Sequence, residues 1–408
     1  MGTVGSLVDH GWDWGDNDSL GYSTLYVRDD TGDPDTSGVL IEPSQRNHAC
    51  TLETTGHTIQ YIRFCQGQAD YGGGSIWSDS GSYATIQNCE LCQGYTSVFN
   101  YYHASTDSGA FVIQDNEVWD TGGNGIQLAN HATGFLIRRN DVHDFALLDE
   151  VSDHDYSAGI KLNAATGCTI EKNHVYDGGG GGTDAGGGVW CDTSSTSDIV
   201  RLNRIHDLIY QGVRIEENSD SCEVYNNVIY GCNAAGYVGG IFVCRYVHST
   251  KVYNNTIYGC TYNMMVQGEY PVQAGSCTNN IIKNNLTWGS TTAELLCYDG
   301  GENDGTYGSG NVYVNNHFQE KTGFVEWGRG NAYNTISAWE TAVGDSAEVG
   351  DNQTGDPSFT NAGAGNFTLQ SDSPCIGAGV DLGASYADAL MPSSTWPDGV
   401  VTGDQDDY

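Results

Sequence analysis

The segment IQDNEV at residues 113–118 contains an aliphatic residue, two variable residues, an Asn, one variable residue and a second aliphatic residue. The same pattern returns six more times along the chain, with its Asn at Asn140, Asn173, Asn203, Asn227, Asn255 and Asn284. An earlier copy, at residues 86–91, has Cys89 in the Asn position. Successive Asn residues are between 24 and 33 positions apart. A fixed motif at a variable spacing predicts the coils of a solenoid joined by loops of different length.

The chemistry of Asn explains why one residue type would recur in this way. Alternation of period two inside each copy predicts a strand. Stacked strands are roughly 4.8 Å apart, so an Asn in the turn of each coil would reach both the local backbone and the Asn of the next coil. Such a ladder would satisfy buried turn backbone. A helix is excluded because Asn, Gly and β-branched residues dominate the repeat.

A second recurrent segment reads Gly-aliphatic-x-aliphatic-x and predicts another strand in each coil, bounded by Gly at the corner. It occupies residues 125–129, 159–163, 188–192, 212–216 and 240–244. Residues 335–343 are the best candidate for a short helix. We expect one continuous domain, with a cap and first coil in residues 1–58, coils in 59–300, and the last coils and a closing segment in 301–408.

Over roughly residues 20–385 the chain resembles secreted bacterial right-handed parallel β-helix proteins of the pectate-lyase-like kind. The Asn motifs, the Gly-bounded strands and the tail segments DPSF (356–359), NFTL (366–369) and SPCIGAG (373–379) carry this resemblance. It implies an all-β, single-stranded right-handed parallel β-helix of roughly ten coils, with an N-terminal cap and an irregular C-terminal segment. It implies little about function, because this architecture occurs in lyases, hydrolases, epimerases and adhesins.

Composition limits the partners of the protein. The net charge is −37 with only 15 Lys and Arg residues, which excludes sequence-independent nucleic-acid binding, and no apolar run is long enough to insert in a membrane. Composition and resemblance together predict a secreted or cell-surface protein, although the first 25 residues lack a signal-peptide pattern. The acidic segments 29–36 and 299–304 could hold Ca²⁺ or form a solvated surface. Among the 13 cysteines, Cys232 and Cys260 occupy equivalent positions in two copies of the repeat. We expect them to form either a disulfide or a pair of stacked, unpaired thiols.

Stacking the second strands in register converts them into a map of one face. The inward positions are aliphatic residues or Cys191. The outward positions fall into two columns. One column contains Gln127, Lys161, Trp190, Arg214 and Phe242, and the other contains Ala129, Asn163, Asp192, Glu216 and Cys244.

Asp192 and Glu216 fall at the same position of adjacent coils, so their carboxyl groups should be roughly 5 Å apart. That separation is typical of a retaining glycosidase. A resemblance to β-helical xylosidases and fucosidases implies Asp192 as the nucleophile and Glu216 as the acid/base. The structural alternative is a carboxylate ladder stabilised by Lys161 and Arg214.

A polysaccharide lyase is a second interpretation of the same patch. Lys161 would remove a proton beside a uronate carboxylate, as the base, and Arg214 would stabilise the intermediate, while Asp192 and Glu216 could hold Ca²⁺. β-Helical alginate and pectate lyases use such sets, but the close Glu-x-Glu spacing of one alginate-lyase group is absent. A third interpretation is a non-catalytic adhesin or surface element that binds glycans.

In every interpretation the partner is a polysaccharide or oligosaccharide, and the hydrolase needs no cofactor. The expected substrate-binding residues are Gln127, His131, Asn163, His154, Trp190, Glu217, Phe242, Arg245 and Tyr270. A further ladder follows the Asn motifs, with Trp119, His143, Tyr176, His206, Tyr230 and Tyr258 each one residue past the second aliphatic position. Asp follows four of these in sequence, at 120, 144, 177 and 207. Regular recurrence favours stacking and turn capping over metal binding or proton transfer.

Overall fold

The computed structural model describes most of the chain. The described residues are 12–15, 24–27, 48–52, 56–65, 74–78, 84–100, 111–130, 132–147, 157–179, 186–233, 239–267, 277–298, 308–328, 330–393 and 400–401. The chain divides into two compact units, residues 1–46 and 47–408. In the first unit, β1 (Trp12–Gly15) pairs antiparallel with β2 (Thr24–Val27). The Ca²⁺ candidates 29–36 and 299–304 lie outside the described residues.

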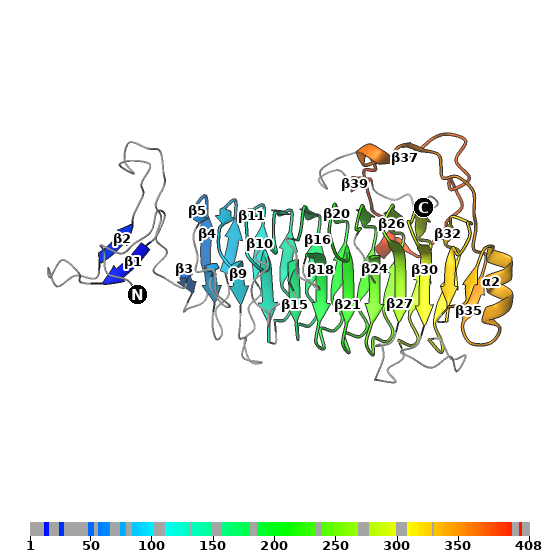
Figure 1. Cartoon of the computed structure of the whole chain (residues 1–408), viewed down its shortest axis with the longest axis horizontal. Coiled ribbons are helices and arrows are strands. Elements are labelled where there is room, and N and C mark those ends of the chain that lie inside the picture. Colours follow the sequence, from blue (N-terminus) through cyan, green and yellow to red (C-terminus); the bar gives the residue numbers. More distant parts are fainter. Residues whose placement is uncertain are drawn as a thin grey trace. The chain divides into compact units, whose positions relative to one another are not determined.

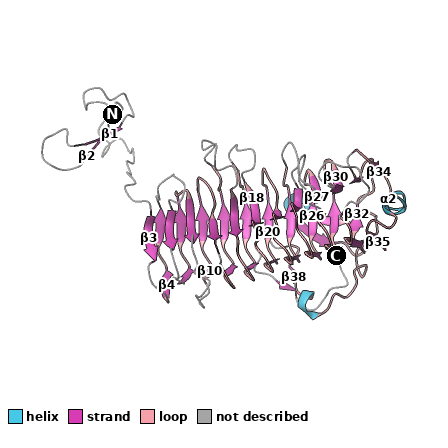
Figure 2. Cartoon of the chain, turned by 90° about the horizontal axis from the view of Figure 1, so that it is seen from below, coloured by secondary structure: helices cyan, strands magenta, loops and turns pink. Residues whose placement is uncertain are grey.

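The second unit is a right-handed parallel β-helix, as expected, in which successive strands join three parallel sheets in turn (Figures 1 and 2). Sheet 1 contains β3 (His48–Leu52), β6 (Gly74–Ser78), β9 (Thr96–Asn100), β12 (Ile126–Ala129), β15 (Ala158–Asn163), β18 (Gly187–Asp192), β21 (Val213–Glu216), β24 (Gly239–Cys244), β27 (Tyr262–Gln267), β30 (Ala293–Tyr298), β33 (Val325–Trp327) and an antiparallel end strand, β34 (Ala332–Tyr333). Sheet 2 contains β4 (His57–Gln60), β7 (Ala84–Gln87), β10 (Val112–Gln114), β13 (Leu136–Arg138), β16 (Thr169–Glu171), β19 (Ile199–Arg201), β22 (Glu223–Tyr225), β25 (Lys251–Tyr253), β28 (Ile281–Lys283), β31 (Val312–Val314) and β35 (Glu348–Gly350). Sheet 3 contains β5 (Arg63–Cys65), β8 (Glu90–Cys92), β11 (Glu117–Trp119), β14 (Asp141–His143), β17 (His174–Tyr176), β20 (Arg204–His206), β23 (Val228–Tyr230), β26 (Thr256–Tyr258), β29 (Leu286–Trp288) and β32 (His317–Phe318).

The C-terminal end closes the helix and then turns back along it. The predicted helix is confirmed as α2 (Ile336–Val343), whose cap residue Thr335 accepts a hydrogen bond from the amide of Ala338. No helix among the described residues is long and apolar enough to cross a membrane. Beyond α2, residues 356–393 form what we call the C-terminal strap, which contains β36 (Phe359–Asn361), the 3-10 turn η2 (Ala362–Ala364), β37 (Asn366–Leu369), η3 (Ala384–Tyr386) and β38 (Ala389–Leu390), the last paired with β39 (Val400–Val401).

Polar side chains at the corner between sheets 2 and 3 hold the strap against the coils. The amides of Asn254 and Asn284 donate to the carbonyls of Tyr386 and Val380 over 3.3 and 2.8 Å. Arg204 donates to the carbonyl of Gly365. The strap therefore packs on the coils near β20 to β29 (Figure 1).

The interior is a continuous column of aliphatic, aromatic and Cys side chains. Cys65 and Cys92 form a disulfide across neighbouring coils of sheet 3. Cys232 and Cys260 are buried free thiols in hydrogen-bond contact, which matches the stacked-thiol alternative. The contact with Cys260, together with burial, raises the pKa of Cys232.

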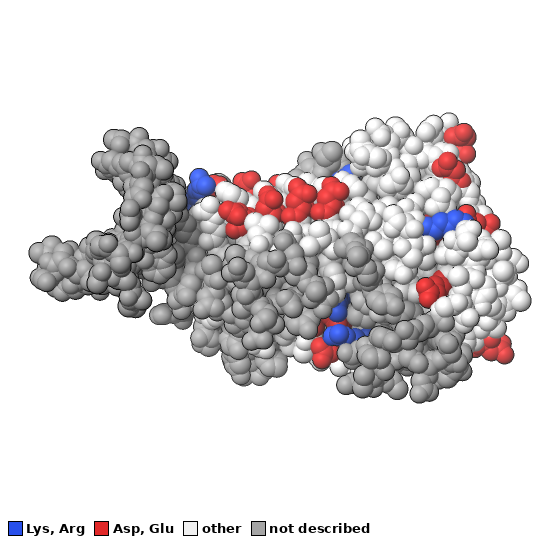
Figure 3. Space-filling model, viewed as in Figure 1, with Lys and Arg blue, Asp and Glu red and all other residues white. Residues whose placement is uncertain are grey.

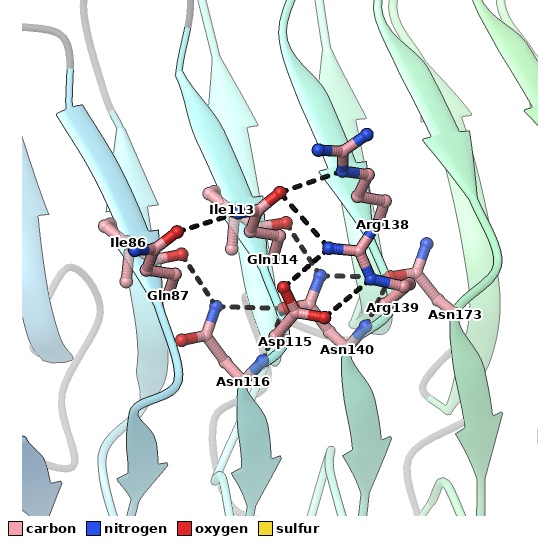
Figure 4. Close-up of polar contacts among 10 residues, drawn as sticks. All are labelled: Ile86, Gln87, Ile113, Gln114, Asp115, Asn116, Arg138, Arg139, Asn140 and Asn173. Atoms are coloured by element: carbon pink, nitrogen blue, oxygen red, sulfur yellow. Dashed lines mark hydrogen bonds and ion pairs between the residues drawn. The ribbon is translucent and has the colours of Figure 1, made fainter. Parts of the chain in front are cut away.

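The Asn ladder lies in the interior at the corner between sheets 2 and 3, and Figure 4 shows three of its members, Asn116, Asn140 and Asn173, joined by hydrogen bonds. The Nδ2 group of Asn140 donates to Asn173 Oδ1 at 3.0 Å and to the carbonyl of Ile113 at 2.9 Å. Its Oδ1 accepts from the backbone amide and the Nδ2 of Asn116. The ladder therefore ties side chain to backbone on three successive coils.

The observed ladder corrects one residue assignment made from the sequence, and it contains two further Asn residues that the sequence motif did not identify. The member after Asn255 is Asn285, not Asn284, because Val252 pairs with Ile282 in the sheet. Asn284 instead adopts a left-handed backbone, with a φ of 57°, and binds the strap. The ladder also continues to Asn316 and Asn352. The motif missed Asn316 because Tyr313 and Phe318 replace both aliphatic residues, and it missed Asn352 because Thr354 replaces the second one.

Replacing Asn173 by Ala removes acceptors and donors from two neighbouring coils and leaves buried backbone groups unsatisfied. We expect a loss of about 2–3 kcal/mol in the free energy of unfolding, since each orphaned buried group costs about 1–3 kcal/mol. Chemical denaturation measures it. The control is Asn331→Ala, at an exposed position, for which we expect a change within about 0.5 kcal/mol. Equal effects of the two variants would show that the ladder is not a main source of stability.

Candidate functional site

The register of sheet 1 brings the predicted patch together. Lys161 pairs with Trp190 in β15 and β18, and Asn163 pairs with Asp192. Trp190 pairs with Arg214 and Cys191 with Ile215 in β18 and β21. Continuing that register by one residue sets Asp192 beside Glu216 on adjacent coils.

The patch is more deeply buried than a map of one outer face implies. The inward residues lie in the core, as expected. However, the outward side chains of Lys161, Asp192, Arg214 and Glu216 are also covered, with residue exposures between 1% and 8%. Burial of paired charges requires close geometry between partners, and the ion pairs below provide it.

Trp190 is at the centre of the cluster, between two cations. Lys161 Nζ lies 3.9 Å from the centroid of the indole ring, and the guanidinium carbon of Arg214 lies 4.2 Å from it. These cations come from the strands on either side of β18, so they cover opposite ring faces. Phe242 continues the column, 5.5 Å from the same guanidinium. Cation–π contacts of this kind are strongest where water is excluded, and they hold the column rigid.

Asp192 forms the more accessible part of the cluster. Its Oδ2 pairs with Lys161 Nζ at 3.0 Å, and its Oδ1 accepts a hydrogen bond from the Thr193 hydroxyl at 3.0 Å. Its side chain keeps 12% of its surface exposed. The neighbouring Thr193 and Glu217 are exposed. A ligand would therefore reach Asp192 from the turn that leads from sheet 1 to sheet 2.

Glu216 is held by two arginines. Its Oε1 lies 2.5 Å from Arg214 and 2.8 Å from Arg245. Arg214 in turn donates to the Tyr210 hydroxyl at 3.0 Å. Arg245 keeps 33% of its side chain exposed, so it links the buried acid to the accessible edge of the cluster.

Burial changes the pKa values of Glu216 and Lys161, the two groups on which acid–base chemistry would depend. Burial raises the pKa of Glu216, although Arg214 and Arg245 oppose this rise and Asp192 adds to it. Burial lowers the pKa of Lys161, and the nearby Asp192 opposes that change. The cluster thus contains a carboxyl group that retains its proton to higher pH and an amine that loses its proton at lower pH than usual.

The accessible edge of the cluster has a repeated backbone conformation. Asn130, Ala164, Thr193, Glu217 and Arg245 each follow a strand of sheet 1 and have φ between 45° and 55°. This left-handed conformation is costly for a β-branched residue. Its recurrence on five coils shows that the turn itself demands it, and it directs Thr193, Glu217 and Arg245 to the same edge.

The structure locates most of the predicted site residues. Gln127 is buried and accepts a hydrogen bond from Asn124 at 2.9 Å, while Asn163 is half-buried beside Asp192. His131, His154 and Tyr270 lie outside the described residues. Sequence reasoning missed Tyr210 and the role of Thr193. Tyr210 lies in the irregular segment before β21, where no repeat identifies it.

The carboxylates of this cluster do not suit Ca²⁺. Asp192 and Glu216 are already paired with Lys161, Arg214 and Arg245, and those cations would repel a metal ion. Within the described ranges, no group of three or more His, Cys, Asp or Glu residues is arranged to hold a metal.

Comparison with known proteins supports the fold. A family described as a right-handed beta helix region matches residues 73–243, and no curated protein matches the chain. Among solved structures, a mutant of the periplasmic alginate epimerase AlgG is 14% identical with a TM-score of 0.50, over 68% of this chain and 62% of that one. The A-module of the Azotobacter vinelandii mannuronan C-5 epimerase AlgE6 is 14% identical with a TM-score of 0.47, over 75% and 80%. XylC, solved with xylose, is 12% identical with a TM-score of 0.40, over 69% and 50%. The chain thus spans less than two thirds of AlgG, and the likeness concerns the fold alone.

Replacing Arg214 by Met leaves Glu216 buried with Arg245 alone. We expect a loss of about 3 kcal/mol near neutral pH, the lower end for a broken buried pair because one partner remains. The loss should shrink as pH falls. A carboxyl group whose pKa is raised on folding binds its proton more tightly in the folded state, so stability decreases as pH rises through that pKa. Chemical denaturation at about pH 5 and about pH 8 measures both effects.

Two further variants test whether the loss in Arg214→Met is electrostatic. The double variant Arg214→Met/Glu216→Gln removes the charge and should recover part of the loss. Arg201→Met breaks the more exposed pair with Glu171 on sheet 2 and should cost less than about 1 kcal/mol. A loss in Arg214→Met that is independent of pH and unchanged by Glu216→Gln would contradict the electrostatic explanation.

Proposed function

We propose that this right-handed parallel β-helix protein is a secreted or cell-surface enzyme acting on a polysaccharide or oligosaccharide, and that it is a retaining glycoside hydrolase using Asp192 and Glu216. One observation carries the proposal: both acids occupy the same outward position on paired strands, β18 and β21. Adjacent strands are about 4.8 Å apart, which agrees with the roughly 5–5.5 Å between carboxyl groups in retaining enzymes. The Cys65–Cys92 disulfide supports an oxidising compartment.

In the first step, Glu216 gives its proton to the glycosidic oxygen as the carbon–oxygen bond breaks, and Asp192 Oδ attacks the anomeric carbon. In the second step, Glu216 takes a proton from water, which attacks the same carbon and releases Asp192. The raised pKa of Glu216 supports the acid role. The ion pair of Asp192 with Lys161 supports an ionised nucleophile.

The surrounding residues would orient the two acids. Arg214, fixed against Trp190 and Tyr210, holds one oxygen of Glu216. Thr193 donates to Asp192. The exposed Glu217 and the half-exposed Arg245 would contact hydroxyl groups of the substrate at the open edge.

A second function is favoured by one observation on Lys161. Burial lowers the pKa of this amine, which would suit a base that removes the proton beside a uronate carboxylate, with Arg214 stabilising the resulting charge. That reaction is uronan lysis, in which the leaving sugar departs, or epimerisation, in which a proton returns from the opposite face. Lys161 is, however, already paired with Asp192 at 3.0 Å, so the hydrolase remains our first proposal.

The hydrolase proposal predicts that Asp192→Asn and Glu216→Gln each lose most of their activity. We expect each change to lower turnover by about 10²–10⁴-fold, the usual contribution of a positioned acid or base. Release of reducing ends from a panel of neutral glycans measures it, with thermal unfolding as the check on folding. The matched control is Glu117→Gln, an exposed acid on sheet 3, which should retain full activity. Full activity in Glu216→Gln would eliminate the proposal.

The two functions also differ in their products and in their need for metal. A hydrolase releases reducing ends without new ultraviolet absorbance, and a chelator should leave its rate unchanged, because the acids are paired with Lys and Arg. A lyase produces an unsaturated sugar that absorbs in the ultraviolet. The lyase would become the preferred proposal if ultraviolet absorbance rises during reaction with uronate polymers, and if this rise is lost in Lys161→Met but kept in Glu216→Gln.

A further inference from the structure

A second feature lies on the outer face of sheet 3, away from the cluster on sheet 1. The predicted ring ladder is present there: Tyr176 stacks on His143 at 5.0 Å and on His206 at 5.2 Å, and His206 stacks on Tyr230 at 4.6 Å. The residue that follows each ring has a left-handed backbone. It is Asp at 120, 144, 177 and 207, and then Gly at 231, 259 and 289.

The change from Asp to Gly opens a cavity of about 350 Å³ beneath the C-terminal strap. Asp207, Tyr230 and Tyr258 line it with Gly231 and Gly259, and residues 362–365 of the strap form the opposite wall. A Cβ atom added at Gly259 would meet nothing within 4 Å, whereas one added at Gly231 would lie 2.8 Å from Asp207 Oδ1, so the open space is at Gly259. The strap is fixed here because Phe367 packs on both Tyr230 and Tyr258, at 5.2 and 5.6 Å.

The lining has the chemistry of a sugar site. Tyr230 and Tyr258 both pack on Phe367 but are only partly buried, and the ring surface that remains would pack against the apolar C–H groups of a pyranose. Asp207 pairs through Oδ2 with His206 Nδ1 at 2.8 Å, and its side chain is 60% exposed, so it can accept hydrogen bonds from hydroxyl groups. The Gly and Ala walls leave room for the ring and expose backbone polar groups. The volume is at the small end of ligand pockets, which suits a single sugar unit.

The charge of this face selects among sugars. Asp207 lies in the cavity wall, and Asp177 and Asp144 follow on the neighbouring coils; their mutual repulsion, after burial, raises the pKa of Asp177. Figure 3 shows acidic side chains in a row along the coils. Arg204 contacts Tyr230 and the carbonyl of Gly365 but is only 1% exposed. The accessible charge here is therefore acidic, which would repel a uronate but not a neutral sugar.

We propose that this cavity is a saccharide-binding site for one unit of a neutral glycan, separate from the cluster on sheet 1. Such a site would anchor a polysaccharide chain to the outer face of sheet 3. It requires binding alone, so it does not rest on the reaction assigned to Asp192 and Glu216.

The test fills the cavity without disturbing the backbone. Gly259→Asn suits the purpose because Asn already occupies left-handed positions of this chain, at 226, 254 and 284. Calorimetry measures binding of cellohexaose, xylohexaose, mannohexaose and maltohexaose, with tetramannuronate as the charged comparison, all in a Glu216→Gln background that prevents cleavage. We expect at least one neutral hexasaccharide to bind, and Gly259→Asn to weaken that binding at least tenfold.

Two controls separate the cavity from other effects. Gly134→Asn makes the same change at another open left-handed glycine and should leave binding unchanged. Ala364→Gln fills the cavity from the strap side and should weaken binding in the same way. It replaces Gly259→Asn as the test if thermal unfolding shows that Gly259→Asn is unstable. Three results would overturn the proposal: no binding of any of the four neutral probes, binding that neither filling variant weakens, or a loss of binding confined to tetramannuronate. None of these results would bear on hydrolysis at Glu216.

Discussion

The in-register stacking of successive coils, maintained by the Asn ladder, is the constraint on which every other feature depends. An interior member of the ladder such as Asn140 accepts two hydrogen bonds and donates two, and so joins three coils at one corner. A one-residue slip of a strand would reverse which side chains face the core. Because the ladder fixes the corner before each strand of sheet 3 from β11 to β32, it also fixes which residues become neighbours on sheets 1 and 3. The cluster and the cavity are both consequences of that register.

The repeat allowed the fold to be predicted because it is periodic and chemically explicit. Asn140 and its equivalents identify the coils, and the Gly-bounded strands predict the order Lys161, Trp190, Arg214, Phe242 that sheet 1 contains. The prediction failed by one residue at Asn284 and Asn285, because Asn284 fits the motif in full whereas Asn285, the ladder member, has Thr287 at the second aliphatic position. Only strand pairing distinguishes a ladder Asn, buried and saturated, from the left-handed Asn beside it that binds the strap.

Other properties could not be predicted because no local pattern encodes them. Alternation shows that Lys161 and Glu216 point away from the core, but not that both are nearly inaccessible. Tyr210 reaches Arg214 from an irregular segment, and the strap reaches Tyr230 from more than 100 residues away. The one sequence feature that marks the cavity is the change from Asp to Gly at the residue after each ring of the ladder. Its meaning required knowing that residues 362–365 cover that position.

Burial gives the two cations of sheet 1, Lys161 and Arg214, a different role from the more exposed cations elsewhere on the coils. Lys161 and Arg214 are enclosed with Asp192 and Glu216, and enclosed charges attract one another far more strongly than solvated ones. Removing either member leaves a costly unpaired charge, so the acids and the cations stabilise each other's positions. The same enclosure raises the pKa of Glu216 and lowers that of Lys161. Fixing the acids and changing the proton affinities of Glu216 and Lys161 are therefore two results of one packing arrangement.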